Sequence, residues 1–88
     1  MKKYLFIFMG GAGTNSGKER CIVHCPELDQ IVIGVPDMKK AIEVAKEFAE
    51  KVEAIELCGY FGKEGRDVEV AKALGTKFRV GAVKYVTD

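Results

Sequence analysis

From residue 30 onward, apolar runs alternate with helical patterns, and this alternation constrains the fold more than any other feature of the chain. Residues 30–35, 54–58 and 78–86 are apolar runs that predict strands. Between them, residues 38–52 and 64–74 carry apolar side chains at helical spacing. A strand–helix–strand–helix–strand order implies right-handed crossovers and parallel strand pairing. The sequence therefore predicts an α/β fold with a mostly parallel sheet.

The first third of the chain adds one or two strands to this pattern. Residues 3–9 form an aromatic and β-branched run that is typical of a central strand. Residues 10–18 contain too many glycines for a regular element and predict a loop. Residues 20–25 fit either a short edge strand or one helical turn, and Pro26 ends this segment. We expect a single domain over residues 1–88, with four or five strands and two main helices in the order β-(β)-β-α-β-α-β.

Size and charge limit the partners of such a domain. A chain of 88 residues can bury one core, but a thin one. Two helices barely cover both faces of a parallel sheet, and an uncovered face or edge favours self-association. We therefore expect a homo-oligomer, with a dimer favoured. The 14 basic and 13 acidic residues are mixed along the chain, which argues against non-specific nucleic-acid binding.

The start of the chain superficially resembles a signal peptide, because Lys2 and Lys3 precede an apolar run. This run is too short for the apolar region of a signal peptide, and far too short to span a bilayer. We interpret it as the first strand and expect a cytoplasmic protein without a membrane partner. The three cysteines, Cys21, Cys25 and Cys58, are then expected to be free thiols.

Residues 56–65 are the best candidate for a site, because a strand there runs into a glycine-rich turn that opens onto a helix. Glycine at positions 59, 62 and 65 permits positive φ angles and exposed N–H groups, and the helix adds positive charge at its N-terminus. Ligands of parallel sheets bind beyond the carboxyl ends of the strands. Residues 10–13, 36–37, 59–62 and 85–87 are expected to gather there, although the pattern does not identify the ligand.

Glu56 and Cys58 alternate with apolar residues on the predicted strand and share one of its faces. A carboxylate in a strand buried on both sides is costly unless it is paired, for example with Arg20, Arg79 or Lys84, or lies at the mouth of a pocket. Glu56 is then either structural, in an ion pair or on a solvent-facing strand surface, or functional, as a ligand contact or general base. Cys58 is either a packed thiol or a nucleophile activated by the following helix.

Two other motifs resemble known sites but fit them poorly. Residues 12–18 approach a P-loop, but Glu19 follows Lys18 where a magnesium-binding serine or threonine belongs. Cys21, His24 and Cys25 lack the paired spacing of a zinc site, and on a strand His24 points away from both thiols. We therefore expect no metal and no cofactor.

The chain also resembles a family of short microbial proteins that carries a domain-of-unknown-function label. The resemblance rests on residues 4–8, 18–20, 32–35, the amphipathic helix, residues 80–83 and, most strongly, the motif Glu-Leu-Cys-Gly-x-Phe-Gly at residues 56–62. It covers nearly the whole chain and implies no activity. The residues that match the family pattern, and that we take as candidate ligand-binding residues, are Arg20, Glu56, Cys58, Gly59, Phe61 and Gly62.

Three functional hypotheses follow. The first is a module that binds a small anionic or polar metabolite at the carboxyl ends of the strands, with Arg20 as the permanent cation. The second is a small enzyme that uses Cys58 or Glu56 and closes residues 10–17 as a lid. The third is a structural or regulatory subunit of an oligomer. Whether the protein catalyses a reaction is left open.

Overall fold

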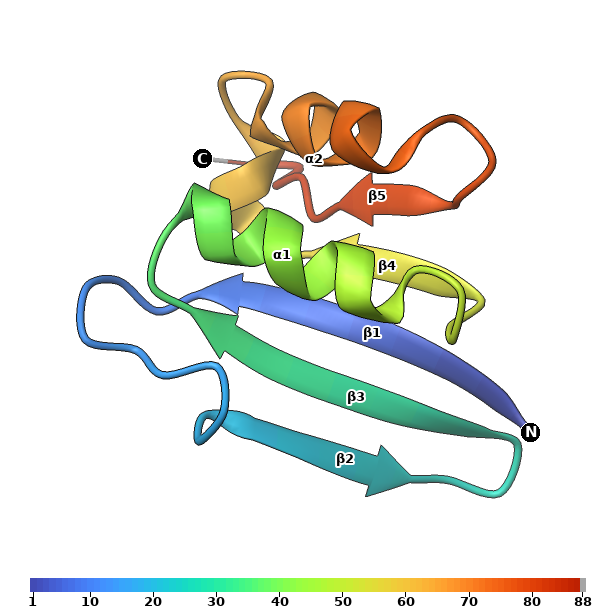
Figure 1. Cartoon of the computed structure of the whole chain (residues 1–88). Helices are drawn as coiled ribbons and strands as arrows, with labels where there is room; N and C mark the ends of the chain where they lie inside the picture. The colour runs from blue at the N-terminus through green and yellow to red at the C-terminus, as the bar shows by residue number, and fades with distance from the viewer. Residues whose placement is uncertain (88) are drawn as a thin grey trace.

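The first strand of the chain lies at the centre of a five-stranded sheet (Figure 1). The computed structural model describes residues 1–87. Its strands are β1 (Lys2–Met9), β2 (Arg20–His24), β3 (Leu28–Val35), β4 (Ala54–Leu57) and β5 (Val80–Ala82). They lie in the order β2–β3–β1–β4–β5, with β2 antiparallel to β3 and all other neighbours parallel. The predicted mostly parallel α/β sheet is confirmed.

Both helices cover the same face of the sheet (Figure 1). Helix α1 (Met38–Phe48) connects β3 to β4, and helix α2 (Arg66–Leu74) connects β4 to β5. The connection from β3 to β4 and the connection from β4 to β5 both run toward the β5 edge of the sheet. Because crossover connections between parallel strands are right-handed, both helices then lie on the same side of the sheet. A 3₁₀ turn, η1 (Gly59–Gly62), precedes α2. Within residues 1–87, no helix lies over the opposite side of the sheet, which we call the open face.

The core lies between the sheet and the helices. Alternate strand side chains point to this side, so Leu5 of β1 is flanked in register by Ile31 of β3 and Ile55 of β4. All three are at most 7% exposed. The remaining buried side chains of this cluster are Ile7, Ile33, Val35, Ala41, Val44, Ala45, Ala49, Leu57, Phe61 and Val70.

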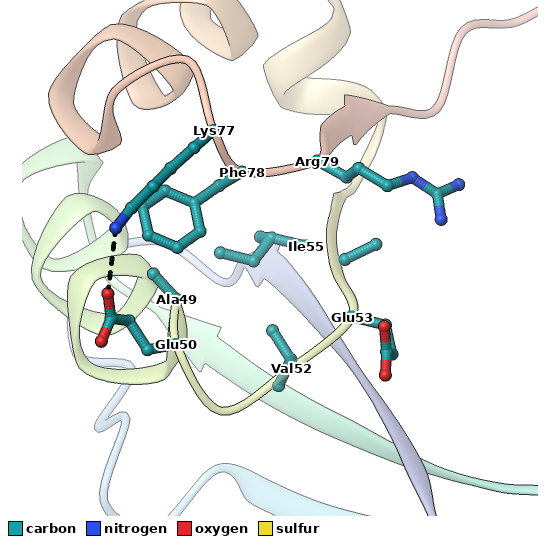
Figure 2. Close-up of a pocket in the computed structure, with 9 residues that line it drawn as sticks. Ala49, Glu50, Val52, Glu53, Ile55, Lys77, Phe78 and Arg79 are labelled. Carbon is teal, nitrogen blue, oxygen red and sulfur yellow. Dashed lines mark hydrogen bonds and ion pairs between the residues drawn. The ribbon is translucent and has the colours of Figure 1, made fainter.

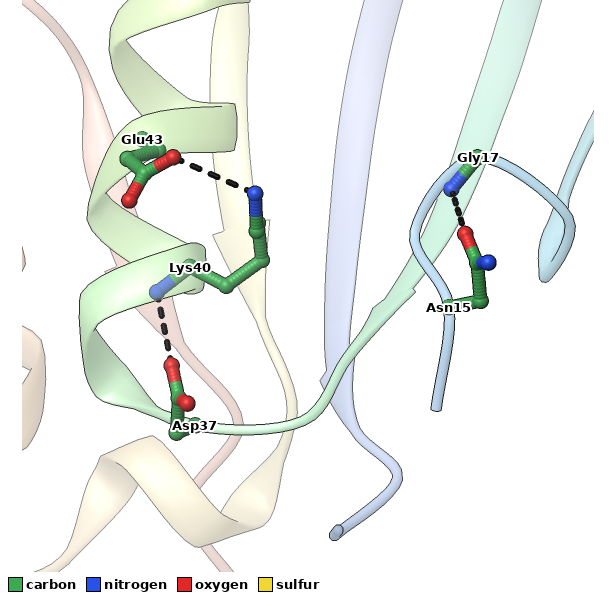
Figure 3. A network of polar contacts seen from close by, with 5 residues as sticks. All are labelled: Asn15, Gly17, Asp37, Lys40 and Glu43. Carbon is green, nitrogen blue, oxygen red and sulfur yellow. Dashed lines mark hydrogen bonds and ion pairs between the residues drawn. The ribbon is translucent and has the colours of Figure 1, made fainter. Parts of the chain in front are cut away.

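Helix α1 begins where its sequence predicts. The Asp37 carboxylate accepts a hydrogen bond from the Lys40 N–H at 2.8 Å, which makes Asp37 the N-cap (Figure 3). The glycine-rich loop between β1 and β2 is ordered by similar local bonds, since the Asn15 side chain accepts from the Gly17 N–H at 2.8 Å (Figure 3). The Asn15 carbonyl also accepts from Lys18 and Glu19, so this glycine-rich segment folds onto itself before β2.

Some boundaries differ from the predicted ones. Residues 20–24 form an edge strand, which resolves the alternative left open for this segment. The predicted helix 38–52 ends at Phe48, where the Lys51 N–H bonds back to the Phe48 carbonyl and tightens the turn. The predicted strand 78–86 is regular only over Val80–Ala82, because its one neighbour, β4, is itself only four residues long.

Candidate functional site

A small cavity lies at the carboxyl edge of the sheet, where β4 and β5 end. Its volume is about 220 Å³, and we call it the carboxyl-edge cavity. It is lined by Gly59, Gly62, Lys63, Val83, Lys84 and Tyr85. The cavity thus lies between η1 and the segment that follows β5, at the edge of the sheet where the sequence predicts a site.

The glycines at this cavity are required by close approach of the chain, not by positive φ angles. A Cβ at Gly59 would lie 2.7 Å from the Tyr85 ring, and a Cβ at Gly62 would overlap the Val83 carbonyl oxygen. Among the three glycines of the motif, only Gly65 has a positive φ, of 73°. The predicted reason for Gly59 and Gly62 is therefore wrong, because these positions make room for the segment after β5.

Cys58 connects the ends of two central strands. Its N–H donates to the Ile7 carbonyl at 3.0 Å, and its Sγ accepts from the Met9 N–H at 3.4 Å. The thiol is half-buried and packs against the core cluster. The only histidine, His24, lies on β2 beside Asp29, at 2.8 Å, near the amino-terminal end of β3. His24 therefore cannot act as a base for Cys58.

Glu56 is exposed on the open face. It lines a hollow of about 320 Å³, the open-face hollow, together with Phe6, Gly81, Ala82 and Val83. Of the two structural alternatives for Glu56, the solvent-facing strand surface is the one observed, because helices cover only one face of β4. Within residues 1–87, Glu56 forms no ion pair with any of the basic residues considered for it.

Neither Arg20 nor Phe61 lines the carboxyl-edge cavity. Arg20 is on β2, three strand positions from β4, which corresponds to roughly 14 Å. Its Nε donates to the Ser16 carbonyl at 2.6 Å, and its guanidinium lies 6.0 Å from the centre of the Phe48 ring. Phe61 is 0% exposed within the core. Of the six candidate ligand-binding residues, only Gly59 and Gly62 line the carboxyl-edge cavity.

The sequence reasoning missed the basic residues of this edge. Lys84 Nζ donates to the Gly62 carbonyl at 3.0 Å and lies 3.3 Å from Asp67 Oδ2. Lys63 also lines the cavity. The sequence contains a signal for Lys84. Residues 85–87 are expected at this edge, and Lys84 directly precedes them, which indicates positive charge there.

A second polar cluster holds η1 against the start of α2. The Arg66 guanidinium lies 3.9 Å from the centre of the Tyr60 ring and donates to the Tyr60 carbonyl at 2.9 Å. Arg66 also pairs with Glu64 at 2.7 Å. Arg66 does not line the cavity, and the basic residues that do are Lys63 and Lys84.

Asp67 is the acidic partner of Lys84. Desolvation works to raise the pKa of the Asp67 carboxyl, but the Val68 N–H and the Lys84 ammonium outweigh it and hold the pKa below its usual value of 3.8. The Val68 N–H donates to Asp67 Oδ1 at 2.8 Å. The carboxylate therefore stays charged and anchors Lys84 beside the cavity.

This lowered pKa predicts a pH-dependent contribution to stability. A carboxyl group with a depressed pKa stabilises the folded state above its unfolded pKa, and this contribution is lost as the pH falls through the folded pKa. We expect Asp67→Asn to lower the free energy of unfolding by less than about 1 kcal/mol at neutral pH, because Lys84 is largely exposed. The difference should shrink below a pH of about 4. Urea unfolding of both proteins across this range measures it, and a difference that grows on acidification contradicts the assignment.

A larger cleft lies at the opposite, amino-terminal edge of the sheet (Figure 2). Its volume is about 480 Å³, with an apolar floor that includes Val52, Ile55 and Phe78. No pattern in the sequence indicates this cleft. At its rim, Lys77 Nζ pairs with Glu50 Oε1 at 3.3 Å, so these two charges neutralise each other.

Metal binding and membrane insertion were both considered from the sequence. Across residues 1–87, no three His, Cys, Asp or Glu side chains are grouped closely enough to hold a metal ion. In the same part of the chain, no helix is both long and apolar enough to cross a membrane.

The comparisons with known proteins place the chain in a family. No curated protein and no solved structure matches it significantly. A family model described as a family of unknown function, DUF6506, matches residues 2–88. The resemblance to a family of unknown function is thereby confirmed, and the chain belongs to the DUF6506 family.

Proposed function

We propose that the protein binds a small anion, such as inorganic phosphate or a short carboxylate, in the carboxyl-edge cavity. The observation that carries this proposal is that two lysines, Lys63 and Lys84, line a cavity whose floor is free of side chains at Gly59 and Gly62. Tyr85 adds a hydroxyl group that can donate a hydrogen bond. This site also agrees with the general position of ligands at the carboxyl ends of parallel strands.

The chemistry of Lys84 suits an anion. Its ammonium group has three N–H donors, of which Gly62 and Asp67 engage two. The third N–H is available to a ligand, while the two engaged ones hold the ammonium in place. Lys63 has no ion-pair partner among residues 1–87, so its charge is also available. An anion would therefore meet the unpaired charge of Lys63 and a fixed Lys84 ammonium group whose charge Asp67 partly offsets.

The volume of the cavity limits the size of the ligand. Sites for drug-sized ligands and cofactors usually measure about 300–1,000 Å³. The carboxyl-edge cavity, at about 220 Å³, falls below this range. We infer that the ligand, or the part of it that enters the cavity, has the size of a phosphate or a short carboxylate. The proposal assigns no reactive role to Cys58 or Glu56, and the free cysteines suit a cytoplasmic setting.

Replacement of Lys84 by glutamine tests this proposal. We expect Lys84→Gln to weaken phosphate binding about tenfold to a hundredfold, because a hydrogen bond to a charged group contributes about 1.5–3 kcal/mol. The measurement is a titration of isotope-labelled protein with inorganic phosphate, and separately with acetate, followed by the amide NMR signals. Signals of Gly59, Gly62 and Tyr85 should move in the wild type.

Lys77→Gln is the matched control, because Lys77 is a paired lysine at the opposite edge of the sheet. It should bind phosphate like the wild type. Lys84→Arg should retain most of the affinity, which separates loss of charge from loss of fold. Signal changes that are absent, or that Lys77→Gln reduces as much as Lys84→Gln, would rule out a phosphate site in the carboxyl-edge cavity.

A further inference from the structure

The open face of the sheet carries a row of aromatic side chains. Tyr4, Phe6 and Phe8 alternate along β1 and point away from the helices, and all three are only partly buried. On β3, Val32 lies in register beside Phe6. Parallel sheets are normally covered on both faces, and aromatic side chains contribute strongly to buried interfaces. The row on β1 is therefore a surface that favours burial.

A glycine on β3 makes room for this aromatic row. Gly34 lies in register with Phe8, and a Cβ at this position would lie 2.6 Å from the Phe8 ring. The ring thus rests directly on the backbone of β3. Phe8 fills the space that a side chain at position 34 would occupy, so the aromatic row extends from β1 over the backbone of β3.

On its other side the row borders the open-face hollow. This hollow, of about 320 Å³, lies between Phe6 of β1 and the residues of β5. A Cβ at Gly81 would meet no atom within 4 Å, so the floor of the hollow at β5 is unoccupied. The aromatic row of Tyr4, Phe6 and Phe8, which we call the β1 ridge, and the open-face hollow therefore lie side by side on one face of one chain.

We propose that two copies of the chain form a dimer through their open faces, with the β1 ridge of each copy in the open-face hollow of the other. A two-fold axis brings the same patch of both copies together, so each copy must carry both complementary features. The ridge and the hollow meet this requirement. This arrangement also covers the side of the parallel sheet that the helices leave exposed.

The charges on this face do not oppose contact between identical copies. Glu56 and Arg79 line one depression of about 380 Å³ that adjoins the hollow. One acidic and one basic side chain give this depression no net charge. Like copies therefore meet without the repulsion that a face of one sign would cause.

The available area reaches the lower limit for a specific interface. The protein exposes 5628 Å², whereas a compact protein of 9.7 kDa is expected to expose about 5,100 Å². The difference, about 500 Å², is similar to the projected area of the five strands, roughly 450 Å² at the usual strand spacing and rise. Two such faces together bury about 1,000 Å², which is the lower limit for a biological interface.

The test is sedimentation of the wild type and three lysine variants over a range of protein concentrations. The wild type should approach twice the mass of one chain as its concentration rises. Gly81→Lys should remain monomeric, because it places a long charged side chain in the hollow, while its Cβ meets no atom of its own chain within 4 Å. Its circular dichroism and melting temperature at low concentration should match those of the wild type.

Two control variants distinguish other modes of association. Val68→Lys alters an exposed apolar residue on α2, and Ile22→Lys alters one on the free edge of β2. Both should dimerise like the wild type. Loss of the dimer only in Ile22→Lys would indicate edge-to-edge pairing of β2 and overturn the proposal. A wild type that is monomeric at all concentrations would also overturn it and would leave the open face to a different partner.

A measurement on the wild type alone avoids any dependence on how the variants fold. A soluble paramagnetic probe broadens NMR signals of exposed groups. The ring signals of Phe6 and Phe8 should become protected from the probe as the protein concentration rises, while those of Tyr85 should not. Equal exposure of Phe6 and Phe8 at low and high concentration contradicts the open-face dimer. None of these measurements involves phosphate, so their outcome is independent of the proposed anion site.

Discussion

A Phe61→Ala variant is expected to lose about 3–5 kcal/mol of the free energy of unfolding. Phe61 is the largest fully buried side chain in the part of the chain that the structure describes, and it is 0% exposed. Its removal takes apolar contacts from the core and leaves a cavity beneath η1, because the surrounding strands cannot collapse into the space. Urea unfolding followed by circular dichroism measures the loss.

Tyr60→Ala is the matched control for this prediction. Tyr60 precedes Phe61 in the same 3₁₀ turn, and their rings make an edge-to-face contact with centres 5.4 Å apart. Tyr60 is 41% exposed, so its removal should cost clearly less than removal of Phe61. Phe61→Leu should retain part of the core contacts and fall between the two. Equal losses for Tyr60→Ala and Phe61→Ala would show that Phe61 does not anchor the core.

Small domains have little stability to lose. Typical values for the free energy of unfolding are about 5–15 kcal/mol, and a thin core lies toward the lower end. The sequence makes Phe61 a candidate ligand-binding residue, because it matches the family pattern. Its position in the core gives it a different role, since it fixes η1 on the sheet and thereby positions Gly59 and Gly62 at the cavity.

The sequence predicted those parts of the fold that local patterns determine. The apolar run of residues 3–9 indicated a central strand, and β1 occupies the centre. Asp37 before a regular apolar pattern indicated the start of α1, and it caps the helix. The alternation from residue 30 onward indicated parallel pairing, which is observed. Each of these features depends on residues close together in the chain.

The segment around β2 shows where local patterns are not sufficient. All five residues of β2 are exposed, so the segment lacks the alternation of buried and exposed side chains that distinguishes a strand from a turn. Its strand conformation is set by antiparallel pairing with β3. This pairing also fixes Arg20 at the far side of the sheet from β4, which the sequence could not reveal because strand order depends on long-range contacts.

The sequence predicts the edge of the sheet at which the carboxyl-edge cavity lies, but not most of the residues that line it. The glycine spacing and the carboxyl ends of the strands indicated this edge. The reason for two of the glycines was wrong, because the segment that packs against them begins more than 20 residues later in the chain, at Val83. Lys84 and Tyr85 enter the site through the same long-range contact. No local rule links these residues to Gly59 and Gly62.

This contact predicts a large effect for Gly62→Ala, which should lower the free energy of unfolding by about 3 kcal/mol. The φ angle of Gly62 is in the ordinary range, so the backbone conformation itself accepts alanine. The added methyl group, however, would overlap the carbonyl oxygen of Val83. Backbone cannot rotate away as a flexible side chain can, so η1 and the segment after β5 must separate. Urea unfolding measures the loss.

Gly81→Ala is the control that isolates this clash, because it makes the same chemical change on the adjacent strand. A Cβ at Gly81 meets nothing within 4 Å, and its φ is also in the ordinary range. We expect it to be neutral or to stabilise by about 0.5 kcal/mol, since alanine restricts the unfolded chain. Gly59→Ala should lie between the two, because the Tyr85 side chain that it meets can move. A Gly62→Ala protein as stable as Gly81→Ala would mean that the segment after β5 does not pack on η1, and the carboxyl-edge cavity would then have no outer wall.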